Sequence, residues 1–168
     1  DGAAALFGVL DGLGHGPAAA GAAVAGVEAL ANARKGRLEV LVALSHRVLT
    51  GTRGAAMSLA RIDFETSKLS WTGIGNVRAN LVAKSVGGVQ VRSSARLVGG
   101  IVGYRIPETR PAQVVSMRTG DLLLITSDGI SEDYLDHHDF AASAVDIAEQ
   151  VLAKHAKETD DAMVLAAR

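Results

Sequence analysis

Three aspartates lie beside apolar, strand-like segments, at positions where an isolated carboxylate needs a positively charged partner. Asp11 follows FGVL, Asp128 follows LLLITS, and Asp160 comes just before AMVLAA. A charge at the end of a buried strand is costly unless a cation pairs with it, and no Lys or Arg lies near Asp11 or Asp128 in the sequence. A hard divalent cation such as Mg²⁺ or Mn²⁺ prefers carboxylate, carbonyl and water oxygens. The three aspartates therefore form a candidate metal site.

Two of these aspartates are followed directly by glycine, as Asp11-Gly12 and Asp128-Gly129. Because glycine tolerates many backbone conformations, its carbonyl can turn inward as a further oxygen ligand. The alternative is that each Asp-Gly pair is an ordinary turn in which the aspartate bonds its own backbone. A single Asp-Gly pair favours the ordinary turn. Three strand-end acids in one small domain give the metal site and the ordinary turn equal weight.

The elements that must position these residues are of mixed type, with helices near both ends of the chain. Apolar patterning predicts a strand over residues 4–11, helices over 17–34, 37–49 and 138–156, and a closing strand over 162–168. Between them lie short β-prone pieces separated by TSK, GNV, VGG and RTGD, which we predict to be hairpins or turns. Helices at both ends of a block of hairpins indicate antiparallel sheets covered by helices.

Composition excludes several functional classes. The 168 residues are 48% hydrophobic, enough for the core of one domain, which we expect to span 1–168. A net charge of −1 and an aromatic content of 4% argue against nucleic acid and anionic membrane as partners. There is no apolar run of the roughly 18 residues that a membrane span needs.

The ends and the cysteine content bear on the location of the protein. The chain has no cysteine, which excludes disulfides and thiolate metal sites and fits a reducing cytoplasm. It begins without Met and runs almost directly into a strand, which suggests that an N-terminal strand is missing from this sequence. We therefore expect a cytoplasmic domain.

Three motifs carry a family resemblance that covers nearly the whole chain. VLDGLGHG, ITSDGISE and TDDAMVLAAR, in this order, resemble the PPM family of metal-dependent protein serine/threonine phosphatases. The resemblance is closer to the SpoIIE-like branch, and DGLGHG with the small size is most similar to its stressosome feedback phosphatases. It implies an α+β fold, a four-layer α-β-β-α sandwich of two antiparallel sheets flanked by helices, with residues 73–82 at the central hairpin.

The resemblance also implies roles for the motif residues. Asp11 would bridge two metal ions, Mn(II) or Mg(II), with the carbonyl of Gly12 on one of them, while Asp128 and Asp160 complete the shell of the other. Such a pair of ions activates a water for in-line attack on phosphorus and neutralises the developing charge. Asp161 is expected to support the ligands from outside.

The chain departs from the family pattern at several positions. The N-terminal acidic motif that supplies a metal ligand in many members is not visible. Asn76 stands where an acid can bind an additional metal, which puts a third site in doubt. Leu13 stands where many eukaryotic members have a histidine suspected of protonating the leaving group. His15 is either a substitute general acid or a solvated or helix-capping residue.

Three histidines besides His15, and the single tryptophan, have simpler structural interpretations. We expect His46 on a helix surface, and the adjacent His137 and His138 in a loop or at a helix start rather than on a metal. Trp71 is expected to pack in the core.

Three residues near the motifs leave two roles open each. Glu132 and Asp133, directly after ITSDGIS, either bond to metal waters or cap the turn. Arg78 either orients the hairpin near the site or pairs with a surface acid.

The resemblance implies that the substrates are phosphoserine or phosphothreonine residues of STAS-domain stressosome proteins. The alternatives are a related phosphatase acting on an anti-anti-sigma factor, and a weak or inactive module that binds a phosphoprotein. The arginines of the 85–111 loop either contact phosphate or an acidic partner or are solvated: Arg92, Arg96, Arg105 and Arg110. A nucleotide-binding loop is excluded, because Pro17 replaces the third glycine of GxGxxG and no GK[ST] occurs.

Overall fold

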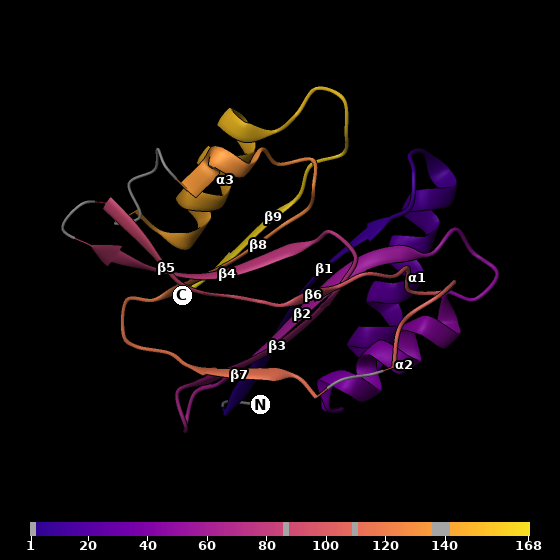
Figure 1. The fold of residues 1–168 in the computed structure, drawn as a ribbon, viewed down its shortest axis with the longest axis horizontal. Coiled ribbons are helices and arrows are strands. Elements are labelled where there is room, and N and C mark those ends of the chain that lie inside the picture. The colour runs from indigo at the N-terminus through magenta and orange to yellow at the C-terminus, as the bar shows by residue number, and fades with distance from the viewer. Residues whose placement is uncertain (1–2, 86–87, 109–110, 136–141) are drawn as a thin grey trace.

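The computed structural model describes residues 3–85, 88–108, 111–135 and 142–168. Two β-sheets pack face to face at its centre; helices α1 and α2 cover the outer face of one sheet, and α3 covers the outer face of the other (Figure 1). This four-layer α+β sandwich confirms the predicted fold class. The elements, in chain order, are β1 (Ala4–Gly12), α1 (Pro17–Ala33), α2 (Leu38–Val48), β2 (Ala55–Asp63), β3 (Lys68–Ile74), β4 (Arg78–Ser85), β5 (Gly88–Ser94), β6 (Leu97–Val98), β7 (Gln113–Ser116), β8 (Leu122–Thr126), the 3₁₀ turn η1 (Glu132–Leu135), α3 (Ala144–His155) and β9 (Val164–Ala167).

The first sheet is built on the antiparallel strands β1, β2 and β3. The far side of β3 is shared by two short strands: β7 pairs with Lys68–Trp71 in antiparallel orientation, and β6 pairs with Gly73 and Ile74 in parallel. The second sheet has the order β5-β4-β8-β9 and is antiparallel throughout. Both sheets are therefore essentially antiparallel, as predicted.

The core follows from the alternation of side chains along the strands, because successive residues point to opposite faces of a sheet. Val9, Trp71, Leu81 and Leu123 meet between the two sheets, and Trp71 is 1% exposed. The opposite face of the first sheet packs against α1 and α2, and that of the second sheet packs against α3. Trp71 is a core residue, as predicted.

Small side chains let α1 lie close to the first sheet. A Cβ atom at Gly26 would come within 2.4 Å of the Leu10 side chain. The helix starts with Pro17 in its first turn, where the missing N–H costs nothing. The prediction for 17–34 is confirmed to within one residue, and α2 occupies most of 37–49.

The third helix is shorter than predicted. It begins at Ala144 because the Ser143 side chain accepts a hydrogen bond from the backbone N–H of Asp146, an N-cap. Residues 142 and 143 are not helical, and positions 138–141 lie outside the described residues.

Two of the four predicted turns do not join paired strands. TSK connects the paired strands β2 and β3, and Ser85 pairs with Gly88 where β4 and β5 meet, while residues 86 and 87 of the predicted VGG turn lie outside the described residues. GNV instead carries the chain from β3 in the first sheet to β4 in the second, and RTGD carries it from β7 to β8. Residues 73–82 are therefore a crossing between sheets, and the expected central hairpin at this position is wrong. In the part of the chain that the structure describes, no helix is long and apolar enough to cross a membrane.

Candidate metal centre

A pocket of about 480 Å³ lies where β1 and β8 end and where the chain approaches β9. Strand β1 brings Asp11, the turn after β8 brings Asp128, and the segment before β9 brings Asp160. The loop that enters α1 adds Gly12 and His15. The structure therefore brings all five sequence-predicted site residues to one pocket. Its remaining lining residues are Leu13, Gly14, Ala56, Asn76, Glu158, Thr159 and Asp161.

The two glycines after the aspartates are required by close backbone packing. A Cβ atom at Gly12 would lie 2.1 Å from the carbonyl oxygen of Ala19 in α1. At Gly129 it would lie 2.2 Å from the carbonyl oxygen of Asp161. Real Cβ atoms do not approach backbone so closely, so neither position accepts a side chain without a shift. Gly129 thus lets the second motif lie directly against the third.

The charges in the pocket repel one another. Burial, followed by the neighbouring carboxylate of Asp128 and then those of Asp160 and Asp161, raises the pKa of Asp11 to about 6. Among the described residues that line the pocket there is no Lys or Arg. A divalent cation is the natural way to relieve this repulsion.

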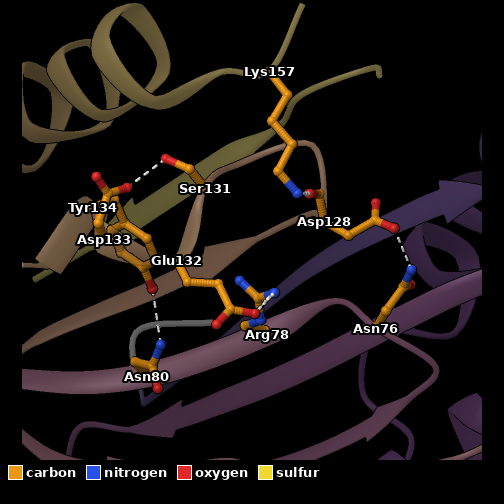
Figure 2. Close-up of polar contacts among 9 residues, drawn as sticks. All are labelled: Asn76, Arg78, Asn80, Asp128, Ser131, Glu132, Asp133, Tyr134 and Lys157. Atoms are coloured by element: carbon orange, nitrogen blue, oxygen red, sulfur yellow. Dashed lines mark hydrogen bonds and ion pairs between the residues drawn. The ribbon is translucent and has the colours of Figure 1, made fainter. Parts of the chain in front are cut away.

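Asp128 is held in place from two directions (Figure 2). The Asn76 side-chain amide donates a hydrogen bond of 2.5 Å to its Oδ2. The Lys157 ammonium donates a hydrogen bond of 2.6 Å to the backbone oxygen of Asp128. The backbone N–H of Lys157 donates one of 2.8 Å to the carbonyl of Gly129. The carboxylate of Asp128 is therefore oriented by an amide, while its backbone is fixed by a lysine that the sequence analysis missed. A basic residue so close to the TDD motif was its only signal.

The residues present fit a hard divalent cation. No three acidic or histidine side chains converge as a ready-made cage in the ranges that the structure describes. Mg²⁺ does not need one, since it typically binds one or two carboxylates and keeps several waters. The neighbouring carboxylates of Asp11 and Asp128 line a polar pocket together with Gly12, and these residues can supply such a donor set.

Exchanging Asn76 for Ala should weaken binding of Mn²⁺ about tenfold, because partners that orient a metal ligand typically contribute 10–100-fold in affinity. The amide of Asn76 donates directly to Oδ2 of Asp128, and alanine leaves that oxygen without this donor. Titration calorimetry measures the affinity, with Asn32→Ala on the exposed side of α1 as the matched control. An Asn76→Ala protein that binds Mn²⁺ as tightly as the original chain would contradict this role.

Glu132 and Arg78 lie outside the pocket and bond to each other. Arg78 Nη2 and Glu132 Oε1 are 2.7 Å apart (Figure 2). This pair ties the start of β4 to the turn after Asp128, so Arg78 both pairs with an acid and braces the site region. The Glu132 carboxylate bonds to Arg78, and Glu132 is not among the described residues that line the pocket.

Ser131, Asp133 and His155 form a separate cluster. Ser131 Oγ donates to Asp133 Oδ1 at 2.6 Å, and His155 Nδ1 lies 3.2 Å from both of these oxygens. The hydrogen bond from Ser131, followed by that of His155, lowers the pKa of Asp133. A hydrolase triad needs the two nitrogens of the histidine to face different partners, whereas Nδ1 serves both here. The cluster therefore joins the end of α3 to the turn after β8.

The remaining candidates are also placed. His46 is half-buried in α2, and its Nδ1 accepts a hydrogen bond of 3.0 Å from the N–H of Gly103, so it is not simply a surface residue. Arg92 pairs with the buried Asp121, and Arg96 and Arg105 line pockets other than the acidic one. His137, His138 and Arg110 lie outside the described residues.

The layers and the acidic pocket define a class of protein, the PPM or PP2C-type phosphatases, and solved structures share this fold. A structure from work on the bacterial stressosome as a modular system adapted to control secondary messenger signalling is 30% identical, with a TM-score of 0.85, covering 99% of this chain and 85% of that one. A crystal structure of RsbX in complex with magnesium is 19% identical, with a TM-score of 0.78, covering 99% and 81%. The PP2C domain of SpoIIE from Bacillus subtilis, with a regulatory fragment, is 17% identical, with a TM-score of 0.71, covering 98% and 54%. The last two likenesses concern the fold.

The chain belongs to the SpoIIE family. The family model described as Stage II sporulation protein E matches residues 1–168. This is a family of metal-dependent serine/threonine phosphatases related to stressosome and Rsb regulators. No curated protein sequence matches the chain significantly.

Proposed function

We propose that this chain is a metal-dependent phosphatase that hydrolyses phosphoserine or phosphothreonine on STAS-domain proteins of a bacterial stressosome in the cytoplasm. The observation that supports the activity is the acidic pocket in which Asp11, Asp128 and Asp160 meet. No Lys or Arg is among the described residues that line it. The substrate class is supported by the 30% identity to a protein from stressosome work, with most of both chains covered.

The aspartates have the first role in this mechanism. Asp11, Asp128, Asp160 and the carbonyl of Gly12 would hold two Mn(II) or Mg(II) ions, and Asn76 would keep the carboxylate of Asp128 in its binding orientation. Bound ions of this kind lower the pKa of a water and neutralise charge on a transferring phosphoryl group.

His15 would complete the reaction. Its side chain is exposed on the loop between Asp11 and α1 and lines the pocket. From there its imidazolium can give a proton to the serine or threonine oxygen that leaves the phosphorus, a step that general acids accelerate by roughly 10²–10⁴-fold.

The test is phosphate release from a phosphorylated STAS-domain stressosome protein, with Mn²⁺, with Mg²⁺ and with a chelator, by the chain and by Asp128→Asn. We expect metal-dependent release that falls by at least about 100-fold in the variant, since the amide removes a charge from the metal site. A phosphorylated anti-anti-sigma factor, which is the alternative substrate, is assayed in parallel to decide between the two substrate classes. Glu65→Gln, an exposed acid in the β2–β3 turn, is the matched control.

Two outcomes would contradict the proposal. Turnover of an aryl phosphate but of neither phosphoprotein would overturn the substrate class. Tight binding of the phosphoprotein by the folded chain, without turnover of any phosphate ester under either metal, would instead support a binding module.

A further inference from the structure

We infer that Arg53 binds the phosphoryl group of the substrate at the rim of the candidate metal centre. This inference rests on the proposed function, because it assigns the cation that receives the phosphate in that reaction.

A phosphate that enters this pocket needs a positively charged side chain beside it, in addition to the metal ions. Five of its lining residues are acidic: Asp11, Asp128, Glu158, Asp160 and Asp161. A phosphomonoester carries up to two negative charges and must approach these carboxylates. Arginine is the side chain best suited to hold it, since its planar guanidinium donates two parallel hydrogen bonds to a phosphate.

Arg53 lies beside the pocket although it is far from its other residues in sequence. It belongs to the loop between α2 and β2. A Cβ atom built on Gly14 would lie 2.7 Å from Arg53 Nη1, so the guanidinium rests over this glycine. Gly14 itself lines the pocket between Leu13 and His15. The absence of a side chain at Gly14 thus gives the guanidinium its place at the rim.

The backbone under Arg53 is held firmly, while the side chain is exposed. The N–H of Leu13 donates to the carbonyl of Gly54 at 3.0 Å, which joins this loop to the loop after Asp11. The N–H of Gly54 donates to Thr52 Oγ1 at 3.0 Å. Ala55 exchanges two backbone hydrogen bonds of 2.9 Å with Val102. Arg53 therefore projects from a fixed position.

Arg53 is also uncommitted, unlike other arginines of the sandwich. Arg61 donates to the carbonyls of Arg34 and Gly36 at the end of α1, and Arg92 pairs with Asp121. Within the described residues, no hydrogen bond or ion pair engages the Arg53 side chain. Its charge is not neutralised by the pocket's own carboxylates and is available to a phosphate.

The test compares Arg53→Ala and Arg53→Lys with the original chain. The control is Arg47→Ala, which removes the same charge from an exposed position on α2. The probe is inorganic phosphate, titrated calorimetrically into the Mn²⁺-loaded protein, and a p-nitrophenyl phosphate assay separates kcat from KM. We expect Arg53→Ala to weaken phosphate binding and to raise KM by at least about tenfold, with a smaller effect for Arg53→Lys, which lacks the planar fork.

The Mn²⁺ affinity and the melting temperature of all three variants should equal those of the original chain within error, because neither Arg53 nor Arg47 is a proposed metal ligand. Phosphate binding by Arg53→Ala equal to that of the original chain would overturn the inference while leaving the phosphatase proposal intact. An original chain that binds no Mn²⁺ and releases no phosphate would overturn the proposed function itself, and this inference with it.

Discussion

Replacing Asp11 with Asn should stabilise the metal-free protein and abolish the metal-dependent activity that we propose for it. Burial and the carboxylates of Asp128, Asp160 and Asp161 raise the pKa of Asp11 to about 6, so its ionised form is unfavourable in the folded chain. The full shift corresponds to about 3 kcal/mol, but Asp11 is only partly buried, and solvent screening reduces the gain to about 1 kcal/mol. For a chain of this size we expect the melting temperature to rise by about 2–4 °C.

The pH dependence of this gain is fixed by the direction of the shift. The carboxyl of Asp11 has a pKa of about 6 when folded and 3.8 as its ordinary value. Between these values the folded chain binds a proton that the unfolded chain has lost, so the free energy of unfolding falls as the pH rises from about 4 to about 6. The difference in stability between the Asp11→Asn variant and the original chain should be absent below about pH 4, grow through this window and remain constant above it.

Metal should reverse the order of stability. A ligand at 100 times its dissociation constant stabilises a folded protein by about 2.7 kcal/mol, and the original chain should gain this from Mn²⁺ while Asp11→Asn gains little. Thermal unfolding at pH 4, 6 and 7.5, with chelator and with Mn²⁺, measures both effects, and Glu65→Gln controls for loss of one acidic group. A variant less stable than the original at pH 7.5 in chelator would show that Asp11 is not repelled by its neighbours.

The residues of the pocket could be predicted because each signal is local. Asp11, Asp128 and Asp160 each lie next to an apolar strand, and an acid in that place is visible without knowing the fold. Their meeting in one pocket follows from the strands that carry them: β1 and β8 belong to different sheets of the same sandwich. His15 entered the prediction because it follows Asp11 closely.

The pairing of strands could not be predicted in the same way. A turn such as GNV shows that the chain changes direction, but it does not show which strand comes to lie beside the next one. β4 pairs with β8, where Leu81 lies opposite Leu123, and not with the preceding β3. That choice depends on burial of both faces, a property of the assembled layers.

Arg53 and Lys157 were missed for a related reason. Each is an exposed basic residue in a loop, and such residues are usually solvated. Only the fold brings the loop after α2 beside Gly14 and the segment after α3 beside Asp128. Basic residues that the fold brings to a site in this way have no local pattern, in contrast to the strand-end acids.

Gly129→Ala should lower both the stability of the protein and the affinity of the proposed metal site. The new Cβ would lie 2.2 Å from the carbonyl oxygen and 2.8 Å from the carbonyl carbon of Asp161, both backbone atoms that no side-chain rotation can move. The segment cannot retreat freely, because Met163 exchanges hydrogen bonds with Ser127, 3.1 Å through the backbone and 2.9 Å through Ser127 Oγ. Overpacking of this kind typically costs about 1–3 kcal/mol, so the melting temperature should fall by several degrees.

The loss of metal affinity should exceed what the loss of stability explains. Gly129 lets the turn that carries Asp128 lie against the segment that carries Asp160, and separating the two by even about 1 Å removes the geometry that ligands of a metal require. We expect Mn²⁺ binding to weaken more than about tenfold at a temperature where calorimetry shows the variant folded. Gly21→Ala is the control, since a Cβ there meets nothing within 4 Å and alanine favours the helix; it should melt no lower than the original and bind Mn²⁺ equally. A Gly129→Ala protein that behaves like this control would mean that the two motifs need not touch to form the site.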